Sequence, residues 1–166
     1  MKNKLIGARR ILIIGDSGRG KSTFAPKLSQ KLNLPVYSTD DFFWKIKFSE
    51  PNDRQESIKK IEKIYLTDDW VVEGGTIHLI RSGLDRADVI INLIFRNIIQ
   101  QWWSLIKRNR DRKYENLMRH LTYVTCKRFG IGNTKEKAKR ELLKPYSDKI
   151  LTLKSYKEMN DLLGDL

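Results

Sequence analysis

Short apolar runs alternate along the chain with stretches in which apolar residues recur at helical spacing. The first run, 11–14, consists of four aliphatic residues with no polar member. After it, Phe24, Leu28 and Leu32 follow at intervals of four residues, as on one face of a helix. Strands without polar alternation are typical of a parallel sheet that helices cover on both faces. The pattern therefore predicts an α/β fold.

The same pattern divides the whole chain into strands and the helices between them. The predicted strands are 11–14, 35–38, 70–72, 89–95 and 149–153. The predicted helices are one that begins near residue 21, one that contains 58–65, a short one at 77–84, and three more at 98–107, from 117 to about 130, and after 155. No repeat or linker interrupts the series, so residues 1–166 are expected to form one domain.

Three local signals refine the helices. Asn52, with Gln55 three residues later, is the predicted cap of the second helix, and Ser155 with Glu158 forms a capping box for the last one. Pro26 lies inside the first helix and lacks the N–H that would bond to the preceding turn. Because Pro26 is close to the helix start, we expect a slight kink and not the loss of the helix.

The segment Gly15–Ser22, with the sequence GDSGRGKS, matches the phosphate-binding pattern G-x-x-x-x-G-K-[ST] in full. It follows the first predicted strand and opens the first predicted helix, which is the context that gives this pattern its meaning. Glycines let successive backbone N–H groups point into one concavity, and the helix dipole adds positive potential there. The sequence therefore predicts a loop that holds nucleotide phosphates.

Two side chains of this loop have predicted roles beyond the backbone. Lys21 can reach the terminal phosphates of ATP as a mobile cation, and the Ser22 hydroxyl can ligate a Mg²⁺ ion that bridges them. The predicted cofactors are therefore ATP and Mg²⁺. The residues predicted to bind the nucleotide are Gly15, Asp16, Ser17, Gly18, Arg19, Gly20, Lys21, Ser22 and Thr23.

Carboxylates follow the second and third predicted strands. Asp40 and Asp41 come after the second strand, and Glu73 ends the third. Ligands of open α/β sheets bind beyond the carboxyl ends of the strands, so these groups could hold magnesium or accept a proton from an attacking hydroxyl. One of the two aspartates could instead cap a helix that starts at Phe42. For Glu73 we expect magnesium and its waters as partners, because a buried carboxylate needs one.

Two further segments could belong to the same site. Gly74 and Gly75 could form a loop in which a substrate approaches the backbone closely, or a plain turn from strand to helix. The sequence does not decide between these alternatives. The basic run 107–113 lies between two predicted helices and could be a lid, a solvated turn or a nucleic-acid contact. The short connection favours a lid, around 107–116, whose arginines stabilise the transferring phosphoryl group. Arg108 is our choice as the catalytic one.

Charge and cysteine content indicate what the protein binds and in which compartment it is found. The chain of 166 residues carries a net charge of +13, which indicates either affinity for polyanions or a lysine-rich surface. No apolar run approaches the roughly 18–20 residues that cross a bilayer. Cys126, the one cysteine, cannot form an internal disulfide. We therefore expect a cytoplasmic protein with no membrane partner; its oligomeric state is not predicted.

The aromatic and histidine residues give weaker signals. Trp102 and Trp103 are most simply interpreted as packing residues, and so is the cluster 42–44, which could also form a stacking wall for a base. His78 and His120 show no metal-ligand spacing. We therefore assign neither histidine a catalytic role.

Several segments together resemble a known family. The phosphate loop, the stretch Ser38–Trp44, the stretch Trp70–Gly74 and the run Ala87–Ile91 look like the small bacterial proteins called DNA topology modulation proteins. These are adenylate-kinase-like members of the P-loop kinases, and the resemblance covers nearly the whole chain. It implies a three-layer P-loop NTPase of the nucleoside- or nucleotide-kinase type, with a five-stranded parallel sheet and helices on both faces.

The resemblance also implies residue roles. The stretch that begins at Asp40 is similar to nucleoside-type kinases, in which the first aspartate after the second strand is the general base; this match makes Asp40 the base. Asp41 stands where the family tolerates a small uncharged residue, and Glu73 stands where we expect aspartate. The added methylene of Glu73 favours a water-mediated contact with magnesium. Lys21, Asp40 and Arg108 are thus the predicted catalytic residues, and Ser22, Asp40 and Glu73 the predicted metal-binding residues.

Two functions compete on these grounds. The leading one is a kinase that transfers the γ-phosphoryl group of ATP to a small acceptor such as a nucleoside or nucleotide. The alternative is a nucleotide-binding, DNA-associated protein whose basic surface gives weak non-specific DNA binding. A polynucleotide end kinase is a third possibility and ranks last, because the short chain leaves little room for a separate nucleic-acid module.

Overall fold

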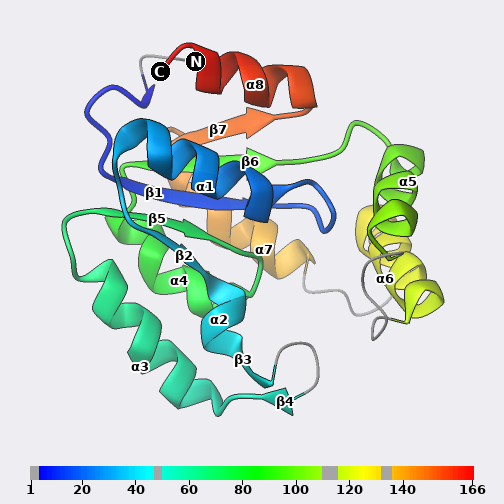
Figure 1. Ribbon diagram of the computed structural model, residues 1–166. Helices are drawn as coiled ribbons and strands as arrows, with labels where there is room; N and C mark the ends of the chain where they lie inside the picture. The colour runs from blue at the N-terminus through cyan, green and yellow to red at the C-terminus, as the bar shows by residue number, and fades with distance from the viewer. Residues whose placement is uncertain (1–3, 47–49, 110–115, 132–135) are drawn as a thin grey trace.

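A computed structural model describes residues 4–46, 50–109, 116–131 and 136–166 (Figure 1). In chain order the elements are β1 (Arg10–Gly15), α1 (Lys21–Leu32), β2 (Val36–Ser38), α2 (Thr39–Phe43), β3 (Trp44–Ile46), β4 (Glu50–Pro51), α3 (Arg54–Tyr65), β5 (Trp70–Glu73), α4 (Ile77–Arg86), β6 (Val89–Leu93), α5 (Ile98–Asn109), α6 (Leu117–Phe129), α7 (Glu136–Leu143), the 3₁₀ turn η2 (Lys144–Tyr146), β7 (Ile150–Leu153) and α8 (Tyr156–Gly164).

The main sheet has five parallel strands in the order β2-β5-β1-β6-β7. Its centre, β1, pairs with β5 on one side and with β6 on the other, with Leu12 opposite Val72 and Ile90. The predicted five-stranded parallel sheet is therefore confirmed, with each predicted strand present. All five strands end at the same edge of the sheet, which is the edge that faces α5 and α6 in Figure 1.

Successive residues of β1 enter two separate cores. Ile11 and Ile13 pack with residues of α1, β7 and α8, whereas Leu12 and Ile14 pack with residues of α3, β5 and α4. All four side chains are fully buried. Because successive side chains of a strand point to opposite faces, an unbroken aliphatic run requires cover on both sides. In Figure 1, α1 and α8 lie over one face of the sheet, and α3 and α4 lie over the other.

Five elements have no counterpart among the predicted strands and helices: β3 and β4, which form a hairpin, the short helix α2, α7 and η2. The hairpin strands contain only three and two residues, so they have no periodicity to detect. For α7 a signal existed, since its sequence EKAKRELL consists of strong helix formers. Leu142 and Leu143, at its end, pack against the core on the α3–α4 face.

The helix caps bear out one prediction and correct another. Ser155 caps α8, its side chain accepting from the Glu158 N–H, as predicted. The cap of α3 is Asp53 and not Asn52, and its carboxylate accepts from the Glu56 N–H at 2.9 Å. Asn52 instead donates its side-chain amide to the Phe42 carbonyl. Helix α1 continues through Pro26 to Leu32.

Seven of the 13 large apolar residues that are exposed in the described part of the chain lie on helices α5 and α6. Trp103 is 70% exposed and Trp102 is 38% exposed, so the interpretation of both as packing residues is wrong for Trp103. Trp102 donates its indole N–H to Thr125 and thereby ties α5 to α6. Apolar residues that face solvent at this density indicate a surface with a partner or ligand. Across the described residues, no helix has the length and apolar content to cross a membrane.

Candidate active site

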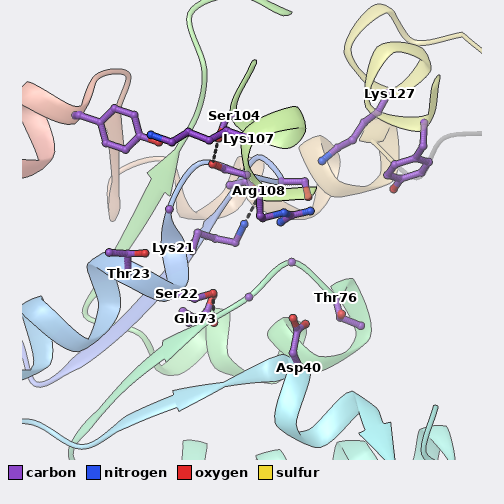
Figure 2. Close-up of a pocket in the computed structure, with 18 of the residues that line it drawn as sticks. Lys21, Ser22, Thr23, Asp40, Glu73, Thr76, Ser104, Lys107, Arg108 and Lys127 are labelled. Atoms are coloured by element: carbon purple, nitrogen blue, oxygen red, sulfur yellow. Dashed lines mark hydrogen bonds between the residues drawn. The ribbon is translucent and has the colours of Figure 1, made fainter. Parts of the chain in front are cut away.

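A cavity of about 520 Å³ opens at the carboxyl edge of the sheet. Its floor is the loop between β1 and α1, and its walls come from α2, from the segment after β5, and from α5, α6 and α7. Figure 2 shows Lys21 near its centre, with Asp40 and Thr76 on one side and Arg108 and Lys127 on the other. The structure thus brings the predicted phosphate loop, Asp40 and Glu73 to one place.

The phosphate loop has a defined backbone because neighbouring elements hold it. A Cβ atom at Gly15 would lie 2.0 Å from the Leu93 carbonyl oxygen, so only glycine lets the loop leave β1 along this path. Two carbonyls of the loop accept from α5: that of Ser17 from the Gln101 amide, and that of Gly18 from the Ser104 hydroxyl. These bonds fix the loop against α5, and within the loop the Arg19 N–H donates to the Asp16 carbonyl at 3.3 Å.

The start of α1 supplies further donors. Its cap residue is Gly20, and no side chain of the described residues caps this terminus. The first N–H groups of a helix lack partners within the helix, and the helix dipole makes the terminus attractive to anions. Ser22 and Thr23 line the cavity beside it. The terminus and the loop together form an anion-binding surface.

Lys21 lies where the loop, the carboxylates and the helix start converge. Its ammonium donates to the carbonyl oxygens of Asp16 at 2.9 Å and Gly15 at 3.3 Å. The pKa of Lys21 lies below the usual value for lysine, chiefly because burial removes water from the charged form; Lys127 lowers it further, while Glu73 raises it. A phosphate next to Lys21 would favour its charged form.

The affinity for nucleotide should therefore begin to fall at a lower pH than it would if Lys21 had the usual pKa of a lysine. The protonated ammonium attracts phosphate and the neutral amine does not, so affinity is full below the Lys21 pKa and is lost as pH rises through it. Because this pKa is lowered, we expect the loss to begin below the usual lysine value of about 10.4. Calorimetric titration with Mg·ATP across pH 7–10 measures the affinity at each pH. Binding should be accompanied by proton uptake in the range where Lys21 is partly neutral. A Lys21→Arg variant, whose charge persists at these pH values, should show a flat profile.

Glu73 is held by two hydroxyl groups. It is 5% exposed, and its Oε1 accepts from Ser22 at 3.0 Å and from Ser38 at 2.7 Å. The expectation that magnesium and its waters are its partners is thus incomplete, because the protein supplies two partners of its own. The first of them comes from the phosphate loop and the second from the end of β2. Glu73 therefore links three chain segments at the floor of the cavity.

The Ser22–Glu73 pair offers the oxygen chemistry that Mg²⁺ prefers. Magnesium is usually held by one or two carboxylates together with substrate phosphates and water. A hydroxyl and a carboxylate lie side by side here, at the edge of the phosphate loop. Among the described residues no group of three or more His, Cys, Asp or Glu could hold a metal ion. The Ser22–Glu73 pair therefore fits a magnesium ion that a bound nucleotide helps to hold.

Asp40 lies in the first turn of α2 and lines the cavity. Its backbone N–H donates to the hydroxyl of Ser38, which is the cap of α2. The alternative that an aspartate caps a helix starting at Phe42 is therefore wrong, since α2 begins at Thr39. The Asp40 carboxylate is half-buried and points into the cavity opposite Arg108 (Figure 2). Asp41 is exposed and is absent from the residues that line the described cavity wall.

Two residues of the loop point away from the cavity. Asp16 accepts from the Phe95 N–H at 2.9 Å and so anchors the loop to the segment after β6. Arg19 is 2% exposed, donates to the Ile94 carbonyl, and lies against the rings of Phe95 and Tyr156. These side chains hold the loop in place. The other predicted loop residues, namely Gly15, Ser17, Gly18, Gly20, Lys21, Ser22 and Thr23, line the cavity.

Gly74 and Gly75 differ in their surroundings although they are adjacent. A Cβ atom at Gly74 would lie 1.8 Å from Thr39 Oγ1, whereas a Cβ atom at Gly75 would meet nothing within 4 Å. Both residues line the cavity. Gly74 is thus required by the close approach of α2 to β5, and Gly75 faces open space.

Gly74→Ala should destabilise the fold, and Gly75→Ala is its matched control. The new methyl group at residue 74 must displace the fully buried Thr39, which costs about 1–3 kcal/mol by overpacking. At residue 75 we expect a change within about 0.5 kcal/mol. Urea unfolding followed by circular dichroism gives both values. Equal stability of the two variants would show that the contact with Thr39 is not restrictive.

The wall opposite Asp40 is basic. Lys107 and Arg108 belong to the last turn of α5, Lys127 to α6 and Lys139 to α7, and all four line the cavity. The predicted lid around 107–116 is described only in part, because residues 110–115 lie outside the described residues. Sequence reasoning missed Lys127 and Lys139, which are far from the motif along the chain and belong to no recognisable pattern.

His120 lies closer to the loop than the sequence indicates. Its Nε2 is 3.0 Å from the hydroxyl of Ser17, a loop residue that lines the cavity. The contact joins α6 to the phosphate loop across 103 residues of chain. Sequence reasoning did not find this contact, and the contact by itself assigns His120 no chemistry.

A second hollow adjoins the cavity between α5 and the start of α8. It has a volume of about 970 Å³ and shares Ser104, Lys107 and Tyr156 with the cavity. Phe95 and Trp103 give it aromatic walls, and basic residues lie around it. The cluster 42–44 does not contribute, because Phe42 and Phe43 pack against the core on the α3–α4 face. The idea that this cluster is a stacking wall for a base is therefore not supported.

Comparisons with known proteins find matches to parts of the sequence. No family model matches the chain. A stretch of 67 residues is 33% identical to the uncharacterized protein YqaC of Bacillus subtilis and covers 40% of this chain and 38% of that protein. A stretch of 78 residues is 32% identical to the adenylate kinase of Thermosipho africanus and covers 47% of this chain and 35% of that enzyme. The matches thus span little more than a third of each relative.

Solved structures match over nearly the whole chain. Shikimate kinase from Acinetobacter baumannii, in complex with shikimate, superposes with a TM-score of 0.54 at 16% identity, covering 99% of this chain and 93% of that one. Shikimate kinase from Bacteroides thetaiotaomicron gives a TM-score of 0.53 at 12% identity, covering 95% of both chains. At such identity the likeness concerns the fold alone. Together with the sheet order and the phosphate loop, it shows that this chain has the fold of the P-loop kinases.

Proposed function

We propose that this protein is an ATP-dependent phosphotransferase that acts on a small acceptor, such as a nucleoside or nucleotide. One observation carries the proposal: the phosphate loop and Asp40 line the same cavity. A protein that only bound nucleotide would need the loop but not a carboxylate across the cavity from it. Catalytic phosphoryl transfer needs both, with positioning and charge stabilisation as the main contributions of the protein.

Each residue has a defined part in this reaction. The loop N–H groups and Lys21 hold the phosphates of the donor. Asp40 accepts the proton of the acceptor hydroxyl while the hydroxyl oxygen bonds to the γ-phosphorus. The bond between the γ-phosphorus and the β–γ bridging oxygen breaks, and ADP is released. Arg108, across the cavity, stabilises the negative charge on the transferring group. Ser22 and Glu73 would hold Mg²⁺, which when bound neutralises phosphate charge.

The second hollow provides a site for the nucleotide base. It shares Ser104, Lys107 and Tyr156 with the cavity, so the base of a nucleotide whose phosphates lie on the loop could reach it. Its aromatic walls suit the flat face of a base. We propose that the donor base lies there, beside α5, and that the acceptor occupies the opposite end of the cavity, beside Asp40.

A screen of acceptors tests the proposal. ADP production is followed with Mg²⁺ and ATP in the presence of nucleosides, nucleoside monophosphates, hydroxy acids and oligonucleotide 5′-ends. Lys21→Ala is the blank, because it removes the cation that contacts the phosphates. We expect ADP formation that depends on one acceptor class and is absent from the blank. Binding of Mg·ATP that no acceptor converts into turnover would contradict a kinase function.

A DNA-associated role, the function that the DNA topology modulation resemblance suggests, is the second candidate. Trp103 is 70% exposed on α5 next to basic side chains of the second hollow, and aromatic and basic groups together suit nucleic acid. Binding to DNA would weaken steeply with salt, with a slope of roughly 0.9 log units per phosphate contact on duplex DNA. Fluorescence anisotropy with labelled duplex and single-stranded oligonucleotides at 50 and 200 mM salt measures this. No binding at the lower salt concentration would eliminate it.

A further inference from the structure

Two helices hold residues Ser17 and Gly18 of the phosphate loop. Gln101 of α5, which is 3% exposed, donates its side-chain amide to the Ser17 carbonyl at 3.2 Å. Ser104 of the same helix donates its hydroxyl to the Gly18 carbonyl at 2.7 Å. Helix α6 makes a contact of another kind, since His120 Nε2 lies 3.0 Å from the side-chain oxygen of Ser17. Helix α5 therefore fixes the backbone of the loop, and α6 acts on a hydroxyl group.

The hydrogen bond between His120 and Ser17 can have either of two directions. A neutral imidazole carries its proton on one of its two nitrogens, so Nε2 either accepts the hydroxyl proton or donates its own proton to the hydroxyl oxygen. In the first arrangement the hydroxyl proton is used within the protein. In the second arrangement that proton is available to a ligand, because the hydroxyl group rotates about its C–O bond. A ligand beside Ser17 therefore selects the direction of the bond.

A nucleotide phosphate selects the second arrangement. Ser17 lines the cavity as part of the loop that is expected to hold phosphates. The oxygens of a phosphate are acceptors, so the Ser17 side chain can bond to one only by donating its hydroxyl proton. Hydrogen bonds from a hydroxyl to a charged oxygen are shorter and stronger than those between neutral groups. The imidazole must then donate its Nε2–H to the Ser17 oxygen, which leaves the hydroxyl proton directed at the phosphate.

We propose that the Ser17 hydroxyl binds a phosphate of ATP and that His120 is the positioning residue that orients this hydroxyl. The proposal rests on the proposed function and adds two side chains to its ATP site. No bond of the reaction forms or breaks on either side chain. His120 acts through Ser17, by keeping the hydroxyl proton directed at the phosphate.

The same hydrogen bond connects nucleotide binding to α6. Every residue of α6 is described, and the helix buries one side chain, that of Val124. Helices with few buried apolar contacts open locally at low cost in free energy. Phosphate that strengthens the bond between His120 and Ser17 also stabilises the docked position of α6, because coupling between two sites is reciprocal. Bound nucleotide should therefore slow amide hydrogen exchange in α6.

The affinity for Mg·AMP-PNP, a non-hydrolysable ATP analogue, measures what the two side chains contribute. Ser17→Ala removes the hydroxyl and should weaken binding about 10- to 100-fold, as for the loss of a hydrogen bond to a charged group. His120→Leu and His120→Asn should each weaken binding about 3- to 10-fold, because leucine has no donor and the asparagine amide is too short to replace Nε2. Glutamine places its amide near the position of Nε2, so His120→Gln should retain the affinity within about threefold. Calorimetry gives each value.

The double variant distinguishes one shared role from two independent ones. If His120 acts through Ser17, adding His120→Leu to Ser17→Ala should weaken binding no further, so the two losses are not additive. Magnesium tripolyphosphate, which has no base or sugar, should show the same losses as AMP-PNP. Thr122→Ala, on the exposed side of α6, is the matched control and should change the affinity less than about threefold. Thermal unfolding verifies that each variant is folded, and His120→Asn replaces His120→Leu in the double variant if the leucine variant is not.

The outcomes separate this inference from the proposed function. Losses that add up in the double variant, or a Ser17→Ala protein that binds AMP-PNP as tightly as the original chain, overturn the inference while the proposed function stands. An equal loss in His120→Gln and His120→Leu contradicts the donor role of Nε2 and overturns it as well. Amide exchange in α6 that nucleotide does not slow contradicts the coupling to this helix. If the original chain does not bind AMP-PNP, the proposed function fails, and the inference fails with it.

Discussion

Asp40→Asn should lower the rate constant for phosphoryl transfer by about 10²- to 10⁴-fold and leave the affinity for Mg·ATP nearly unchanged. The asparagine side chain has the shape of the aspartate but cannot accept the proton of the acceptor hydroxyl. Asp40 lines the cavity on the side opposite Arg108 and makes its backbone contact through Ser38, so α2 should keep its place. Steady-state kinetics with a turned-over acceptor measures kcat, and calorimetry measures ATP binding.

The neighbouring Asp41 provides the matched control. It has the same side chain and lies in the same turn of α2, but it is exposed and does not line the described cavity. Asp41→Asn should therefore change kcat less than about threefold. A fully active Asp40→Asn protein, or an equal loss in both variants, would show that Asp40 is not the base.

Glu73→Gln should shift the magnesium dependence of activity to higher Mg²⁺ concentrations, with the apparent affinity for Mg²⁺ falling about 10- to 100-fold. Glu73 accepts from the hydroxyls of Ser22 and Ser38, so it orients the Ser22 oxygen as well as supplying charge. Removing its charge also removes the influence that raises the Lys21 pKa, which should weaken phosphate binding further. Rates measured across a Mg²⁺ titration at saturating ATP report the change.

The variant Glu73→Asp separates the effect of the negative charge from the effect of side-chain length. Aspartate keeps the negative charge but is shorter by one methylene, so the hydrogen bonds to both serines must lengthen. If charge dominates, Glu73→Asp should retain more activity than Glu73→Gln. If the two variants have the same magnesium dependence as the original chain, Glu73 serves the fold and not the metal.

The fold was predictable because its signals are local and strong. The residues of β1 alternate between two cores, and an aliphatic run without polar members predicts such a strand directly. The phosphate loop is equally local, since eight consecutive residues specify its pattern. Glu73 and Asp40 were found because the carboxyl ends of parallel strands meet at one edge of the sheet.

Other parts of the site depend on contacts between distant segments. No pattern in the sequence joins Ser38 to Glu73, or His120 to Ser17, because these contacts follow from how the strands and helices pack. The same holds for Lys127 and Lys139, two lysines in a chain with 33 basic residues. The motif also did not show that Arg19 points away from the cavity and lies against two aromatic rings. Side-chain direction within a loop is decided by its neighbours.

The predicted lid and the extent of the domain remain predictions. Arg108 faces the cavity at the end of α5, in agreement with a basic element that approaches the phosphates. The arginines at positions 110 and 112 lie outside the described residues, so the choice of Arg108 among them is a proposal. Alanine variants at each position, compared by kcat at saturating ATP, would rank them.

The most direct test of the central claim follows the γ-phosphoryl group itself. ATP labelled with ³²P at the γ-position is incubated with the protein, Mg²⁺ and a mixture of small hydroxy compounds, nucleosides and nucleotides, and the products are separated. We predict an acceptor-linked, labelled product that Lys21→Ala and Asp40→Asn do not form. Label that stays in ATP, or that appears only as inorganic phosphate, would contradict the account, because the phosphate loop would then serve binding or hydrolysis and not transfer.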